Sequence, residues 1–104
     1  MIYFSDIRNR KIRFTIERRK HLEENHPEMV QQESIIKKTL EAPDKIVLSK
    51  TDSEVELFYK YFDNTPVDAK HLCVVVKSSG DDNFIITSYF TDTIKKGKLL
   101  WTKK

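Results

Sequence analysis

KHLCVVVKSSGDDNFIITSYFT, residues 70–91, is the stretch that decides the fold class. Two runs rich in β-branched and aromatic residues, 70–77 and 84–91, flank a polar segment that contains Gly80. Such runs on either side of a short polar loop are typical of a β-hairpin. The sequence therefore predicts that the protein is built around an antiparallel pair of strands.

Outward from this hairpin, the apolar residues keep a period of two back to Pro43 and follow a helical period between residues 16 and 41. Further strands are predicted at residues 45–48 and 55–62, and a short one at residues 10–16. Helices are predicted at residues 16–25, from residue 27 to about residue 41, and as a turn at residues 91–96. Helices followed by neighbouring strands with short connections predict an α+β fold with the helices on one face of an antiparallel sheet.

Length and composition limit the class of protein. The chain has 104 residues, which favours a single domain spanning residues 1–104. Its apolar runs are strand-sized, so no membrane-spanning helix is expected. Cys73 is the only cysteine and the N-terminus lacks a signal-peptide pattern, so a reducing, cytoplasmic location is expected.

Charge is segregated along the chain. Residues 1–20 carry seven basic and two acidic residues, and residues 95–104 carry five lysines and no acidic residue. The segment between them is acidic. If the two ends meet, Arg13 and Arg19 join Lys95 and Lys96 in one positive field suited to RNA. The alternative is that the charged ends only keep the domain soluble.

The first predicted helix contains residues suited to acid-base chemistry. Arg18 and His21 are three positions apart and share a helix face. An imidazole can act as base or acid near neutral pH, and a guanidinium can hold a phosphate. His26 points elsewhere on a regular helix unless the break at Pro27 redirects it. The alternative for His21 is a surface histidine that pairs with a nearby glutamate. The alternative for His26 is a cap of the helix end.

The last long strand carries a second candidate set. Strand alternation places on one face Ile85, Thr87, Tyr89 and Thr91, and on the other Phe84, Ile86, Ser88 and Phe90. Thr87 and Tyr89 are candidates for binding phosphate or ribose, and Tyr89 for stacking on a base. His71 and Lys77 are expected on the same side, where Lys77 adds a positive charge. The alternative is simple threonine pairing between strands.

Other classes of chemistry find little support. Cys73 lies in a β-branched run and is expected to be a small core residue. The histidines and the cysteine lack zinc-ligand spacing, and both glycines are isolated. No metal or other cofactor is therefore expected.

Several segments together resemble one known family. They are T-I-E-R-R-K-H-L-E-E-N-H-P-E-M from Thr15, I-I-K-K-T-L-E-A-P-D-K-I, Y-K-Y-F, H-L-C-V-V-V-K and F-I-I-T-S-Y-F-T-D-T-I-K-K-G-K-L-L-W. The chain resembles the phage and mobile-element nuclease domains grouped with barnase, EndoU, colicin-type and RelE-like toxins. The resemblance runs from about Phe4 to Trp101 and implies two N-terminal helices packed on a four-stranded antiparallel sheet.

The resemblance also implies a toxin-like hydrolase that cleaves RNA without a metal. The matching positions are Arg18, His21, His26, Thr87 and Tyr89, with Lys95 in the closing motif. In a consistent mechanism, His21 deprotonates the ribose hydroxyl, Arg18 and a sheet lysine stabilise the phosphate charge, and Tyr89 or His26 protonates the leaving oxygen. RNA is the expected partner, together with an acidic inhibitor or immunity protein.

Two other functions are consistent with the same residues. One is a module of the same fold that binds RNA or protein without catalysis. The other is a regulatory partner in a two-component system, in which the acidic middle of the chain contacts another protein.

Overall fold

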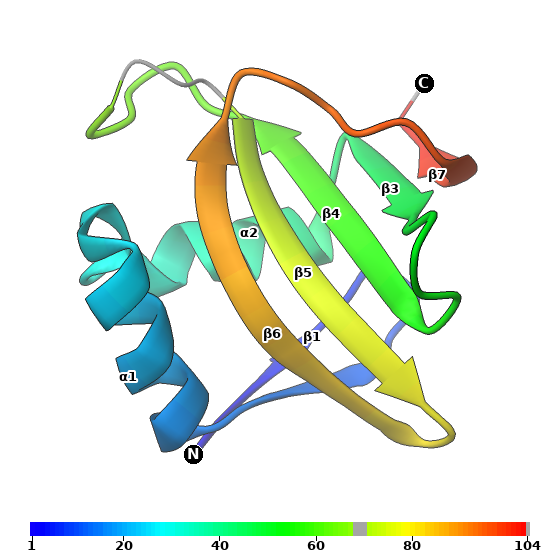
Figure 1. Cartoon of the computed structure of the whole chain (residues 1–104), viewed down its shortest axis with the longest axis horizontal. Helices are drawn as coiled ribbons and strands as arrows, with labels where there is room; N and C mark the ends of the chain where they lie inside the picture. Colours follow the sequence, from blue (N-terminus) through cyan, green and yellow to red (C-terminus); the bar gives the residue numbers. More distant parts are fainter. Residues whose placement is uncertain (68–70, 104) are drawn as a thin grey trace.

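The computed structural model describes residues 1–67 and 71–103, and within them the chain forms two α-helices, one 3-10 turn and seven strands (Figure 1). The elements are β1 (Ile2–Ser5), β2 (Lys11–Phe14), α1 (Ile16–Asn25), η1 (Pro27–Met29), α2 (Glu33–Glu41), β3 (Lys45–Leu48), β4 (Val55–Tyr61), β5 (His71–Ser79), β6 (Asp82–Thr91) and β7 (Lys98–Thr102). Lys70, expected to begin a strand, and Lys104, in the basic C-terminal segment, lie outside the described residues.

The strands form one mixed sheet in the order β1-β2-β6-β5-β4-β3-β7. Neighbours are antiparallel except β2 and β6, which run parallel. The expected two helices on a four-stranded antiparallel sheet are therefore wrong. The added edge strands β1 and β7 are only four and five residues long and lack a strong pattern of their own. β1 pairs with the neighbouring β2, and β7 pairs with the distant β3.

The helical region differs from the prediction in its second half. The α1 bounds agree with it, because the Thr15 side chain accepts a hydrogen bond from the Arg18 backbone N–H and Pro27 ends the helix. The single helix expected from residue 27 to residue 41 is split into η1 and α2. Gln31, with φ of 63°, lies between them in the left-handed region and interrupts the helical hydrogen bonds.

The segment after β6 also differs from the prediction. Residues 91–96 were expected to form a helical turn, but residues 93–96 have no regular secondary structure. Residues 98–102 then pair with β3 as strand β7. The chain thus crosses the sheet from β6 to its far edge after Thr91 (Figure 1).

Apolar side chains cover both faces of the sheet. On the helix-covered face, α2 contacts β5, β1 and β4, and Leu22 of α1 packs into the same core. Figure 1 shows α2 behind the sheet and α1 beside β6. The opposite face, called the open face below, carries a second buried cluster: Val47, Val55, Leu57, Tyr59, Cys73 and Val75. The predicted alternation in β4 is confirmed, because Leu57 and Tyr59 join this cluster and Phe58 joins the helix-side core.

Candidate functional site

The strand register aligns polar side chains across the open face. Tyr59 pairs with Cys73, and Cys73 pairs with Tyr89, so these three residues form one row across β4, β5 and β6. The adjacent row is Leu57, Val75 and Thr87. Because side chains alternate along each strand, both rows project from the same face. The open face therefore combines an apolar floor with a border of hydroxyl groups.

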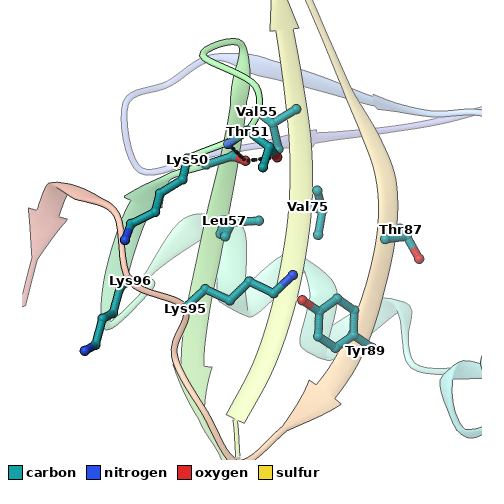
Figure 2. A pocket seen from close by; sticks show the side chains of 10 residues that line it. Lys50, Thr51, Val55, Leu57, Val75, Thr87, Tyr89, Lys95 and Lys96 are labelled. Atoms are coloured by element: carbon teal, nitrogen blue, oxygen red, sulfur yellow. Dashed lines mark hydrogen bonds between the residues drawn. The ribbon is translucent and has the colours of Figure 1, made fainter.

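A pocket of about 390 Å³ lies over these rows (Figure 2). Its floor consists of Val55, Leu57 and Val75, and Thr87 and Tyr89 border it on β6. The rest of the lining comes from two segments beyond the central strands: Ser49, Lys50, Thr51, Lys95 and Lys96. A pocket with an apolar floor and several cationic side chains suits a ligand that is part flat and apolar, part anionic.

A β-bulge sets the orientation of the β6 residues. Val75 pairs with Thr87 but Val76 pairs with Ile85, so Ile86 is an extra residue in β6. Ile85 consequently lies in the helix-side core, and Ile86 packs against the open-face cluster. The strict alternation expected for residues 84–91 is wrong at these two isoleucines. The bulge removes Ile85 from the face that carries Thr87.

The lysine side of the pocket depends on residues 92–97. The backbone N–H of Lys95 donates a hydrogen bond to the Tyr59 hydroxyl at 3.1 Å. In Figure 2 the side chain of Lys95 points toward the hydroxyl of Tyr89, whereas that of Lys96 points away. No ion pair among the described residues uses Lys50, Lys95 or Lys96. These ammonium groups are thus free to meet an anionic ligand.

Burial keeps the Cys73 thiol and the phenol groups of Tyr59 and Tyr89, which share one row across the sheet, protonated. It raises the pKa of the Cys73 thiol to about 11, although hydrogen bonding to Tyr89 and Tyr59 partly opposes this. Burial also raises the pKa of Tyr59 to about 12 and raises that of Tyr89, and the nearby Cys73 adds to both effects. A protonated thiol is a poor nucleophile, which agrees with the expected core role of Cys73. A protonated Tyr89 can donate a hydrogen bond to an anion.

His26 is the histidine that meets this row. It ends α1 with φ of −134° and ψ of 76°, so the break before Pro27 takes it off the helical path. Its ring stacks on Tyr89, with ring centroids 5.8 Å apart and an interplanar angle of 29°. Its Nδ1 lies 3.8 Å from a carboxylate oxygen of Glu28. The sequence left open whether the break at Pro27 redirects His26. The structure shows that it does, and the His26 imidazole lies against Tyr89, which borders the pocket.

His21 and Arg18 lie elsewhere on α1 and do not line the pocket. Both side chains are exposed, and His21 Nδ1 is 3.1 Å from the side-chain nitrogen of Asn25. His71 forms a T-shaped ring contact with Tyr61, with centroids 5.7 Å apart, and it too lies outside the pocket lining. Among the described histidines, His26 is the one that contacts a pocket residue.

Three of the cations expected to bind RNA are engaged by acidic residues. Arg13 bonds Asp82 at 2.8 Å and lies over the Phe84 ring. The other two pairs join Arg19 to Glu33 at 2.5 Å and Lys77 to Asp52 at 3.3 Å. Each of the three is therefore paired with an acidic residue within the described part of the chain.

The sequence reading did not identify Lys50, Ser49 and Thr51 as part of a site. They occupy the turn between β3 and β4, where the Ser49 N–H bonds the Val55 carbonyl and closes the turn. Their polar composition indicated a turn and nothing more. Only the β3–β4 pairing brings this turn to the edge of the pocket.

Comparisons of the chain with protein-family models, curated proteins and solved structures gave no match. Within residues 1–67 and 71–103, no helix is long and apolar enough to cross a membrane. The same residues contain no group of three or more His, Cys, Asp or Glu arranged to hold a metal ion.

Proposed function

We propose that this chain is an endoribonuclease that cleaves RNA by attack of a ribose hydroxyl on the adjacent phosphate. The observation that carries the proposal is the convergence of Thr87, Tyr89 and Lys95 in one pocket, with the His26 ring stacked on Tyr89. Hydrogen-bond donors, a cation and an imidazole are the groups that this reaction requires.

Each group has a role that its position supports. His26 acts as the base that takes the proton of the ribose 2′-hydroxyl. Tyr89, which burial keeps protonated by raising its pKa, donates a hydrogen bond to a phosphoryl oxygen together with Thr87. The Lys95 ammonium offsets the negative charge that builds on phosphorus. Neither His26 nor His21 lines the pocket itself, but His26 stacks on the lining residue Tyr89. His21, expected to be the base, has no such contact and therefore no step in this scheme.

The reaction balances without a further reactant. The 2′ oxygen forms a bond to phosphorus, the bond from phosphorus to the 5′ oxygen breaks, and that oxygen takes up the proton that His26 removed from the 2′-hydroxyl. The products are a 2′,3′-cyclic phosphate and a 5′-hydroxyl. Because RNA supplies the nucleophile and side chains supply the proton transfers, the scheme needs no metal ion.

The family resemblance supports the same activity in a toxin-like protein of a phage or mobile element. It also supports an acidic inhibitor or immunity protein as a partner, whose acidic side chains match the free lysines at the pocket. A cytoplasmic location fits the single, buried Cys73, which can remain reduced there. These parts of the proposal rest on the resemblance and on residue chemistry.

A labelled RNA oligonucleotide incubated with the purified chain in excess chelator tests the proposal. We expect products that end in a 2′,3′-cyclic phosphate, and no cleavage of a DNA oligonucleotide of the same sequence. The Tyr89→Phe variant, purified in parallel, controls for contaminating ribonuclease and is expected to cleave more slowly. Intact RNA, or equal cleavage of DNA, would contradict the proposal.

The second candidate function is a binding module without catalysis. The apolar floor formed by Val55, Leu57 and Val75 favours it, because such a floor can hold a base or an apolar side chain without any reaction. This candidate would be supported over the nuclease if RNA binds tightly, loses affinity as the salt concentration rises and remains intact in the same assay.

A further inference from the structure

Tyr59 lies beneath the pocket without lining it. Its side chain is fully buried in β4, yet its hydroxyl accepts the hydrogen bond from the backbone N–H of Lys95, 36 residues later in the chain. In the part of the chain that the structure describes, this is the hydrogen bond that ties the Lys95 backbone to the sheet. A buried side chain thus holds an exposed and irregular segment.

Gly97 provides a second attachment for the same segment. A Cβ added at this position would overlap the carbonyl oxygen of Leu48 and come within 2.9 Å of Val47 Cγ1. The backbone at Gly97 therefore lies directly against β3, where a side chain cannot fit without displacing the chain. Residues 95–97 are fixed to the sheet at both ends, and the Lys95 side chain leaves from between these attachments.

Tyr59 also touches the reactive side of the pocket. Its neighbour across β4 and β5 is Cys73, and the neighbour of Cys73 across β5 and β6 is Tyr89. The Cys73 thiol interacts with both phenol groups. Tyr59 is therefore placed to set the position of Lys95 and to support that of Tyr89.

We infer that Tyr59 is a positioning residue, whose hydroxyl holds residues 95–97 so that the Lys95 ammonium faces an anion in the pocket. The inference rests on the proposed function for the identity of that anion, an RNA phosphate. Tyr59 makes no contact with RNA in this account and acts only through Lys95.

Two measurements test this inference. The first is hydrogen exchange of the Lys95 amide, which needs no RNA. In Tyr59→Phe, which keeps the ring and deletes the hydroxyl, we expect that amide to exchange about fivefold faster, the change that loss of one hydrogen bond produces. The buried amide of Val74 in β5 reports any general loss of stability, and the Lys95 rate is compared with it.

The second measurement is affinity for a 2′-O-methyl RNA, which cannot be cleaved at its sugar. We expect Tyr59→Phe to weaken binding about fivefold in the wild-type background. In a Lys95→Ala background, the same change should weaken binding no further, because Tyr59 acts through Lys95. Gly97→Ala, which disturbs the other attachment, should reproduce the loss. Tyr3→Phe removes an exposed phenol from the far edge strand and should change neither measurement.

The outcomes separate the inference from the proposed function. An unchanged Lys95 exchange rate relative to Val74, or an equal loss of affinity with and without Lys95, would overturn the inference. A wild-type chain that does not bind RNA would contradict the proposed function, and the Lys95 exchange rate alone would then decide the role of Tyr59. If Tyr59→Phe fails to fold, the same two measurements on Gly97→Ala decide whether the inference holds.

Discussion

The two basic segments of this chain look alike in sequence and behave differently in the structure. In the N-terminal segment, Arg8 and Arg10 bond Glu56 at 2.5 and 2.6 Å, and Arg10 also bonds the buried Asp6 at 2.8 Å. In the C-terminal segment, Lys95 and Lys96 line the pocket and pair with no acidic residue that the structure describes, whereas Lys103 lies 4.0 Å from Asp44. The two segments therefore have the same net charge, but their cations differ in whether acidic residues engage them.

The sheet order explains the difference. β1 and β7 are its two outermost strands, and Figure 1 shows the two chain ends on opposite sides of the molecule, whereas the charge pattern suggested that they meet. The N-terminal edge meets the acidic residues of the middle segment, such as Glu56 on β4. Residues 92–97 instead cross the open face, whose cluster is apolar. The tertiary partner, and not the local charge, decides which cations remain free.

The largest expected effect concerns the paired segment. The Asp6 carboxylate is buried and accepts hydrogen bonds from the backbone N–H groups of Arg8 and Arg10 and from the Arg10 side chain. Asp6→Ala leaves these donors unmatched, and we expect a loss of about 3 to 5 kcal/mol in the free energy of unfolding, measured with urea. The salt dependence of RNA binding by the folded variant should not change. If the free energy of unfolding fell by less than about 1 kcal/mol, as expected for an exposed surface ion pair, the structural role assigned to this segment would be wrong.

The next effect concerns Cys73, which lies beside the pocket, and is a change of the free energy of unfolding with pH. The Cys73 pKa is about 11 in the fold against an ordinary 9.0, so the unfolded thiol ionises first as pH rises. The unfolded state then holds fewer protons, and Cys73 alone lowers the stability of the fold by about 2 to 3 kcal/mol between pH 9 and 11, in addition to the effect of Tyr59 and Tyr89. Urea unfolding of wild type and Cys73→Ala at pH 8 and 10.5 should show their stability difference shrinking by about 2 kcal/mol. Asp6→Asn keeps Cys73 and should therefore decline with pH as the wild type does. A constant stability difference between wild type and Cys73→Ala would contradict this account.

The smallest effect separates the two sets of cations directly. Each lysine that neutralises a phosphate of single-stranded RNA contributes about 0.7 to the slope of log affinity against log salt concentration. Lys95→Ala and Lys96→Ala should each lower that slope by up to about this amount. Arg13→Gln and Arg19→Gln, which break ion pairs with Asp82 and with Glu33, should leave it unchanged. Equal slope changes for arginines and lysines would show that both segments bind RNA.

The sequence supports the centre of the fold better than its edges. Alternation gave the correct faces of β4, and Thr15 and Pro27 gave the correct bounds of α1, because these signals are local. β7 and the parallel pairing of β2 with β6 depend on partners far away in sequence, whereas β1 pairs with the nearby β2. Such pairings leave little trace in a four- or five-residue segment.

The candidate site was predictable only in part. Thr87 and Tyr89 were found because a strand repeats every two residues, but the bulge at Ile86 changes the phase before them. Helix geometry favoured His21 over His26 as the site histidine. The change of backbone direction at the end of α1 instead places His26 against the pocket residue Tyr89. Lys50 had no local signal beyond that of a turn. Each difference arises where the chain departs from regular geometry.

The central claim is that the pocket on the open face cleaves RNA with His26 as its base, and the most direct test compares two histidines on one helix segment. Initial rates of cyclic-phosphate formation should be measured for His26→Ala and His21→Ala, with folding checked by urea unfolding. A general base contributes roughly 10²- to 10⁴-fold, so His26→Ala should lose that much while His21→Ala stays within about twofold of wild type. A variant lacking His26 that cleaves at the wild-type rate, or a loss confined to His21→Ala, would contradict the account.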